Sequence, residues 1–144
     1  MLHLKSSIEI RTSADRVWGI LTDFAAYPAW NPFVRSIQGE QAPGSALRVT
    51  VQPEGSAGMS FKPRLLSFAP RKELRWKGQV LFPGVFDGEH YFLIDEVNNN
   101  AVHFTQGEVF SGILVPLLFR GSMRRGTEQG FHAMNRALKI RAEG

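Results

Sequence analysis

The sequence predicts a protein of the α+β class, in which a curved antiparallel sheet wraps around one long C-terminal helix. Its 144 residues suit one domain, over residues 1–144, with one core. Short segments with strand patterns, separated by turn residues, fill the middle of the chain. The C-terminal segment instead carries apolar side chains at helical spacing.

The N-terminal part predicts one strand followed by one or two short helices. Residues 3–11 alternate in polarity, as a half-buried strand does. Residues 12–15 (Thr-Ser-Ala-Asp) have a Thr-x-x-Asp capping pattern and predict a helix start. Pro28 ends this helix or forces a short second one. The apolar face of the first helix is formed by Val17, Ile20, Leu21 and Phe24.

The middle of the chain predicts six further strands, so that the sheet has seven in all. Pro, Gly and Asn mark the breaks, as at 43–44, 83–84 and 98–100. Short breaks between consecutive strands imply hairpins and an antiparallel meander. The six predicted strands are residues 33–39, 46–51, 60–68, 73–81, 87–97 and 102–110.

The last element is predicted to be a helix from near Gly112 to about Ala142. A seven-stranded sheet with one helix to cover it must curl around that helix, which can leave a void between them. Glycines interrupt the helix and each costs roughly 1 kcal/mol relative to Ala. They indicate either close packing on the sheet or removal of bulk where a ligand lies. The glycines are Gly121, Gly126 and Gly130, and the apolar stripe is Met123, Thr127, Phe131, Met134 and Leu138.

Composition excludes several classes of function. The chain has no Cys, which rules out disulfides, Cys-ligated metals and thiol catalysis. No His-x-x-x-His spacing, Gly-rich phosphate loop or Gly-x-Ser-x-Gly motif is present, so we expect no metal and no cofactor. The N-terminus lacks a signal-peptide pattern, and the apolar run at 113–119 is too short to span a bilayer. We therefore expect a cytoplasmic protein.

The net charge of +4 lies entirely in the C-terminal segment. Residues 120–144 hold six basic and two acidic side chains, while the preceding residues balance at eleven of each. An anionic membrane surface or a nucleic acid would suit such a segment. The solvated face of an amphipathic helix is the alternative explanation. Because no aromatic residues interleave with the basic ones, we expect no nucleic-acid partner and favour the solvated face over a membrane surface.

Strand alternation predicts which side chains face the helix. Gly88, His90, Phe92 and Ile94 share one parity and are assigned inward. If the even positions of 102–110 face the same way, a carboxylate and an amide, Glu108 and Gln106, lie among aromatic rings. This composition fits a pocket for a small molecule, mostly apolar with a few polar groups.

The sharpest chemical hypothesis joins His90 and Glu108. A buried Glu with a nearby His could share a proton and act as acid and base, enolising a ketone or assisting an aldol cyclisation or dehydration. The alternative is a hydrogen-bonded core His, with Glu108 paired to Arg120 or Arg124. The sequence leaves both open.

Four segments make the chain resemble the START-like superfamily, also called SRPBCC or Bet v 1-like, and within it the polyketide cyclase/dehydrase-type members. They are residues 13–33 (with Ser-Ala-Asp-Arg-Val-Trp and Tyr-Pro-Ala-Trp-Asn-Pro-Phe), 74–78 (Leu-Arg-Trp-Lys-Gly), 88–92 (Gly-Glu-His-Tyr-Phe) and 108–112 (Glu-Val-Phe-Ser-Gly). The resemblance implies the helix-grip fold over nearly the whole chain. It does not choose a function, because the superfamily includes lipid carriers, hormone receptors, cyclases, hydroxylase domains and co-chaperone-like modules. This chain lacks the Cys and His residues that bind metal in the oxygenase members of the superfamily.

Three functions therefore stand. The first is a carrier or sensor that binds a hydrophobic small molecule, such as a lipid, isoprenoid or polyketide-like compound. The second is a cyclase or dehydratase that uses His90 and Glu108, and the third a protein-partner module that uses the basic helix face. The chain could be a monomer or a dimer. The expected ligand-binding residues are Trp30, Phe33, Phe61, Trp76, Phe92, Phe104, Gln106, Phe110, Met123 and Phe131.

Overall fold

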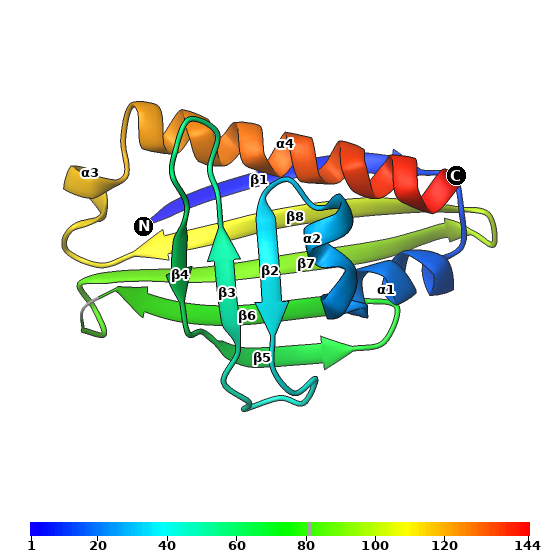
Figure 1. The fold of residues 1–144 in the computed structure, drawn as a ribbon, viewed down its shortest axis with the longest axis horizontal. Coiled ribbons are helices and arrows are strands. Elements are labelled where there is room, and N and C mark those ends of the chain that lie inside the picture. The colour runs from blue at the N-terminus through cyan, green and yellow to red at the C-terminus, as the bar shows by residue number, and fades with distance from the viewer. Residues whose placement is uncertain (81) are drawn as a thin grey trace.

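A computed structural model describes residues 1–80 and 82–144, with the side chain of residue 80 also left aside. The structure consists of a large sheet, a small sheet, short helices after the first strand and a long helix at the C-terminus (Figure 1). The elements are β1 (Leu2–Ile10), α1 (Ala14–Thr22), the 3-10 helix η1 (Phe24–Ala26), α2 (Tyr27–Trp30), β2 (Val34–Gln38), β3 (Arg48–Val51), β4 (Met59–Phe61), β5 (Arg64–Ala69), β6 (Glu73–Val80), β7 (Phe86–Asn98), β8 (Ala101–Ser111), α3 (Val115–Leu118) and α4 (Ser122–Glu143).

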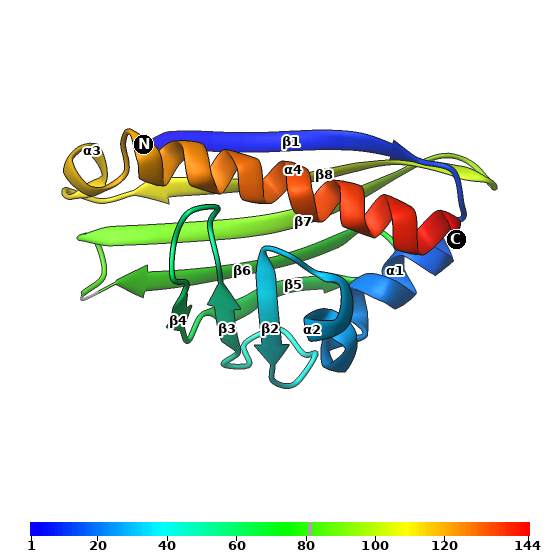
Figure 2. The ribbon, with the colours of Figure 1, turned by 45° about the horizontal axis from the view of Figure 1, so that its top comes forward.

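The two sheets and α4 form the layers of the fold. The large sheet has the order β1-β8-β7-β6-β5 and the small sheet the order β2-β3-β4, with every neighbouring pair antiparallel. The strands of the small sheet run across those of the large one (Figure 1), and α4 runs along the large sheet (Figure 2). None of the described helices is long and apolar enough to cross a membrane.

The predicted seven-stranded single sheet is wrong, because the described residues form eight strands in two sheets. The difference arises at Lys62-Pro63, inside the strand predicted for 60–68. Pro63 has no backbone N–H for a ladder and breaks the strand. The part before the break, β4, pairs with β3, and the part after it, β5, pairs with β6. The remaining predicted strands are found with shifted ends, and Leu81, the last residue predicted for 73–81, lies outside the described residues.

The predicted start of the long helix is also wrong. The chain first forms the single turn α3, and α4 begins only at Ser122. Gly121 has a φ of +58° and Gly112 a φ of +119°, conformations that interrupt a right-handed helix. At the N-terminus, Ser13 rather than Thr12 caps α1, its Oγ accepting from the Arg16 N–H at 3.2 Å.

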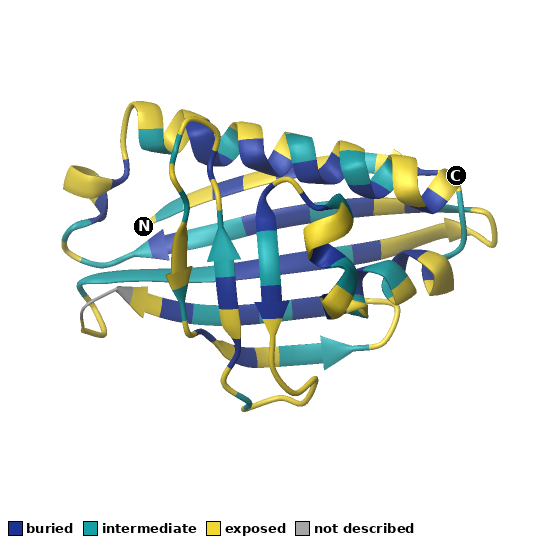
Figure 3. Cartoon of the chain, viewed as in Figure 1, coloured by how far each residue is buried: buried dark blue, intermediate teal, exposed yellow. Residues whose placement is uncertain are grey.

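One hydrophobic core joins both sheets with the helices. Buried positions lie in the middle of β7, alternate over residues 102–106 of β8 and recur on one side of α4, whereas most turn residues are exposed (Figure 3). The even positions 102, 104, 106 and 110 are buried, as the predicted parity requires. The largest fully buried side chains of this core include Trp76, Phe92, Phe104, Phe131, Met134 and Leu138.

Two of the three predicted helix glycines, Gly126 and Gly130, are places of close packing, whereas Gly121 precedes α4 and has open space around it. A Cβ on Gly130 would overlap the ring of Phe33, and a Cβ on Gly126 would overlap the carbonyl oxygen of Glu54 in the β3–β4 loop. The Glu54 N–H also donates to the Gly126 carbonyl at 3.2 Å. These glycines let the small sheet and its loop approach α4, which supports the packing explanation.

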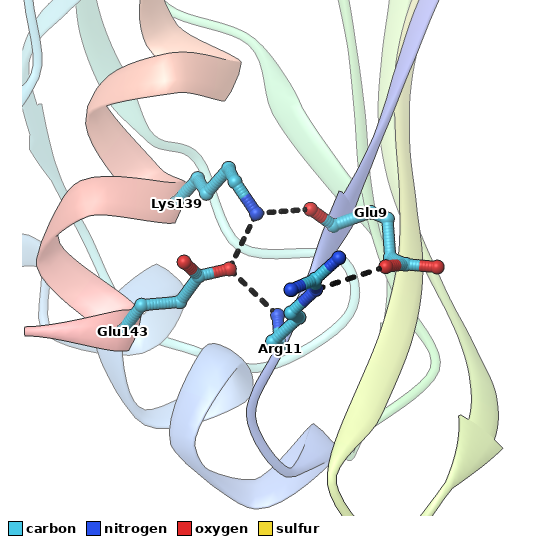
Figure 4. Close-up of polar contacts among 4 residues, drawn as sticks. All are labelled: Glu9, Arg11, Lys139 and Glu143. Carbon is cyan, nitrogen blue, oxygen red and sulfur yellow. Dashed lines mark hydrogen bonds and ion pairs between the residues drawn. The ribbon is translucent and has the colours of Figure 1, made fainter.

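The C-terminal end of α4 is tied to the end of β1 by polar contacts (Figure 4). Glu143 accepts from the Arg11 backbone N–H at 2.7 Å and from Lys139 Nζ at 2.5 Å, and Lys139 also donates to the Glu9 carbonyl at 2.9 Å. The Arg11 N–H and then the Lys139 ammonium lower the pKa of Glu143 below its usual value. The contacts therefore favour the charged carboxylate.

Packing at Gly130 predicts opposite effects of the same substitution in two helices. Gly130→Ala should lower the free energy of unfolding by about 1–2 kcal/mol, since the overlap with Phe33 outweighs the gain in helix propensity. Gly19→Ala in α1, where a Cβ meets nothing within 4 Å, should raise it by about 0.5–1 kcal/mol. Urea unfolding followed by circular dichroism measures both. Stabilisation by Gly130→Ala would contradict the packing described.

Candidate functional site

A cavity of about 330 Å³ lies between the N-terminal half of α4, one end of the large sheet and the small sheet. Most of its lining is apolar. The large sheet contributes Trp76, Gly78, Gly88, His90, Glu108 and Phe110, and the small sheet with its flanks contributes Phe33, Val51, Pro53, Met59 and Phe61. Gln79, Phe86, Leu118, Phe119, Met123 and Thr127 complete the wall. The volume is at the lower end of the range for small-molecule pockets.

Two glycines on neighbouring strands form the floor of the cavity. Gly78 of β6 and Gly88 of β7 are register partners. A Cβ on Gly78 would come to 3.1 Å from the Phe61 ring, and a Cβ on Gly88 would overlap Glu108 Oε2. The missing side chains therefore leave room for Phe61 and for the Glu108 carboxylate.

Aromatic rings close the end of the cavity near α3. Phe110 and Phe119 stack with ring centroids 4.0 Å apart, and Phe86 lies 6.0 Å from Phe110 and 6.2 Å from Phe119. Phe119 follows the single turn α3, so the break in the predicted helix places its ring over the end of the sheet.

The polar part of the wall is a hydrogen-bonded pair. His90 and Glu108 are register partners on β7 and β8, and His90 Nδ1 lies 3.0 Å from Glu108 Oε1. The His90 side chain is 3% exposed and that of Glu108 16%. Among the described residues of the lining, only His90 and Glu108 have side chains that can ionise. Glu108 does not pair with Arg120 or Arg124, and Arg124 instead contacts Glu128.

The His90 ring is held in one orientation by its neighbours. The Trp76 ring stacks on it at 5.1 Å with an interplanar angle of 13°, and Phe131 approaches edge-on at 5.4 Å. Its second nitrogen, Nε2, lies 3.2 Å from Gln106 Oε1. Both nitrogens of this buried ring are therefore hydrogen-bonded.

Nine of the ten predicted ligand-binding residues fall into two groups in the structure. Five of them line the cavity, together with His90 and Glu108: Phe33, Phe61, Trp76, Phe110 and Met123. Four others, Phe92, Phe104, Gln106 and Phe131, are buried further along the same strands and helix, where side chains fill the space. The pocket therefore occupies one end of the helix–sheet interface and the core the other.

Trp30 lies outside the cavity. It ends α2 and packs against Tyr27, with ring centroids 5.3 Å apart. Its indole nitrogen is buried without a hydrogen-bond partner among the described residues. We assign it to packing around α2.

Several lining residues were not predicted. Thr127 belongs to the apolar stripe of the helix, so its spacing could have placed it in the wall. Val51, Pro53 and Met59 reach the cavity only because the small sheet folds across the large one, which no local pattern indicates. Among the described residues, no group of three His, Asp or Glu side chains could hold a metal ion.

The described geometry is that of a helix-grip protein with an apolar pocket. The sequence family described as "Polyketide cyclase / dehydrase and lipid transport" matches residues 1–143, and the chain belongs to this family. This confirms the resemblance to the START-like superfamily drawn from the sequence. No curated protein matches the chain.

Solved structures share the fold. A START superfamily protein from Mycobacterium smegmatis superimposes with a TM-score of 0.74 at 21% identity, covering 98% of this chain and 97% of its own. The Zhui aromatase/cyclase from Streptomyces sp. R1128 superimposes with a TM-score of 0.76 at 18% identity, covering 99% of this chain and 93% of its own. The protein XoxI from Bacillus cereus superimposes with a TM-score of 0.70 at 16% identity, covering 98% of this chain and 95% of its own. At these identities the likeness shows the fold alone.

Proposed function

We propose that the protein binds a hydrophobic small molecule in the cavity above Gly78 and Gly88, as a carrier or sensor. The observation that carries this proposal is an apolar cavity of about 330 Å³ whose described lining has one ionisable pair, His90 and Glu108. Pockets of this composition bind apolar molecules and use a few polar groups to orient them. The family description, which includes lipid transport, agrees with the proposal.

Direct binding of an uncharged fluorescent probe tests this function. N-phenyl-1-naphthylamine should bind the wild-type protein with increased fluorescence, because the cavity removes the probe from water. Met123→Trp should weaken binding at least about tenfold, roughly 1.4 kcal/mol, since the larger ring fills the pocket. Fluorescence titration measures the dissociation constant.

Ile140→Trp supplies the matched control. Ile140 lies on the same helix but is 68% exposed and does not line the cavity. This variant should bind the probe as the wild type does. Equal weakening by both substitutions, or no binding to the wild type, would argue against the cavity as the binding site.

A second candidate function is catalysis by the His90–Glu108 pair. The observation that favours it is their 3.0 Å hydrogen bond in the wall of an apolar pocket. A carboxylate in such a place can take a proton from a carbon next to a carbonyl group. Relatives that share the fold include an aromatase/cyclase, so a cyclase or dehydratase acting on a polyketide-like ketone is the natural enzyme class.

Proton exchange on a small ketone distinguishes an enzyme from a binder. In D₂O, an enzyme of this class should accelerate deuterium exchange at the methyl group of 2-acetylnaphthalene. Glu108→Gln, which keeps the side-chain volume, should lose about 100-fold or more of that acceleration. NMR follows the exchange, with N-phenyl-1-naphthylamine binding as the control for an intact pocket. Equal exchange with and without protein would leave binding as the function.

A further inference from the structure

The Glu108–His90 pair is the first part of a longer buried chain of polar side chains. Gln106 Nε2 donates to the Phe131 carbonyl at 3.3 Å and to Asn135 Oδ1 at 2.7 Å. Asn135 Nδ2 donates to Ser6 Oγ at 3.2 Å, and Ser6 Oγ lies 2.9 Å from His132 Nδ1. The chain thus crosses the helix–sheet interface from the cavity to His132, which is exposed.

The chain has one consistent set of donors and acceptors. The Gln106 amide nitrogen faces two acceptors, the Phe131 carbonyl and Asn135 Oδ1, so Gln106 Oε1 must face His90. Gln106 Oε1 can only accept, and His90 must therefore carry a proton on Nε2. Gln106 and Asn135 act as positioning residues that set the protonated nitrogen of His90.

The same reasoning sets the protons between His90 and Glu108. With Nε2 protonated, the 3.0 Å contact between Nδ1 and Oε1 needs one further proton, on either atom. Without it, a lone pair would face a carboxylate. With another proton on Oε2, the pair would be a cation in an apolar wall whose described residues include no carboxylate besides Glu108 itself. One shared proton between Nδ1 and Oε1 satisfies both atoms and keeps the pair neutral overall.

This distribution leaves Glu108 Oε2 without a proton. Oε2 lies over Gly88 in the cavity floor and has no hydrogen-bond partner among the described residues. We propose that Glu108 Oε2 is a hydrogen-bond acceptor for the ligand, and that the pocket selects uncharged apolar molecules carrying a hydroxyl or similar donor. The choice of ligand rests on the proposed binding function, whereas the proton arrangement is a property of the empty protein.

NMR of the empty, labelled protein tests the proton arrangement. The ¹⁵N spectrum of the His90 ring at neutral pH should show a fully protonated Nε2 and an Nδ1 that shares its proton. Gln106→Met removes the acceptor at Nε2, so the ring should change to the form protonated on Nδ1 alone. Ser6→Ala, at the far end of the chain of hydrogen bonds, should leave the protons of the His90 ring unchanged. Gln106 keeps its orientation in this variant because its Nε2 still donates to the Phe131 carbonyl. A wild-type His90 protonated only on Nδ1 would overturn the inference, even if Gln106→Met fails to fold.

Matched probes test the ligand class. The wild type should bind 2-naphthol about tenfold tighter than 2-methoxynaphthalene, which has the same rings but no donor. Glu108→Met should abolish this preference while both probes still bind. Equal affinities for the wild type would overturn the acceptor role and leave the proposed function intact. Failure of both probes and of N-phenyl-1-naphthylamine would instead overturn the proposed function and the ligand class with it.

Discussion

The hydrogen bond between Gln106 of β8 and Asn135 of α4 is the contact on which the arrangement of this protein depends. Both side chains are 2% exposed or less and their amides lie 2.7 Å apart. Loss of one partner would leave a buried polar group unsatisfied, at a cost of about 1–3 kcal/mol. The bond therefore fixes where along its length α4 meets the sheet, and it also orients the amide that contacts His90.

The interface between α4 and the large sheet is packed differently on the two sides of this hydrogen bond. Toward the C-terminus of α4, Met134 and Leu138 are fully buried against the sheet, together with Phe92 and Phe104 on its strands. Toward the N-terminus, glycines replace side chains in the sheet and the small sheet supplies the opposite wall. A cavity remains there because the helix is held by packing at its other end and by the buried amides. The His90–Glu108 pair lies at the boundary, where it is largely buried yet faces the cavity.

Much of this could be predicted from the sequence, because strand alternation is a local property. The parity of 102–110 identified the inward face, and register pairing brought His90 opposite Glu108. Position along a strand is not local, so Phe92, Phe104 and Phe131 could not be told from the rings that line the cavity. The small sheet was missed because the break at Pro63 looks like any irregularity inside a strand. Its contribution to the wall depends on one sheet crossing the other, a property of the whole fold.

Native mass spectrometry of the protein purified from its own host tests most directly whether the cavity binds a small molecule. A binding protein should show, beside the 16.1 kDa chain, a second species heavier by the mass of one small molecule. That molecule should be lost on denaturation and should be uncharged and apolar with a hydroxyl or similar donor. The mass of the chain alone, in preparations kept under native conditions throughout, would contradict a carrier with a resident ligand.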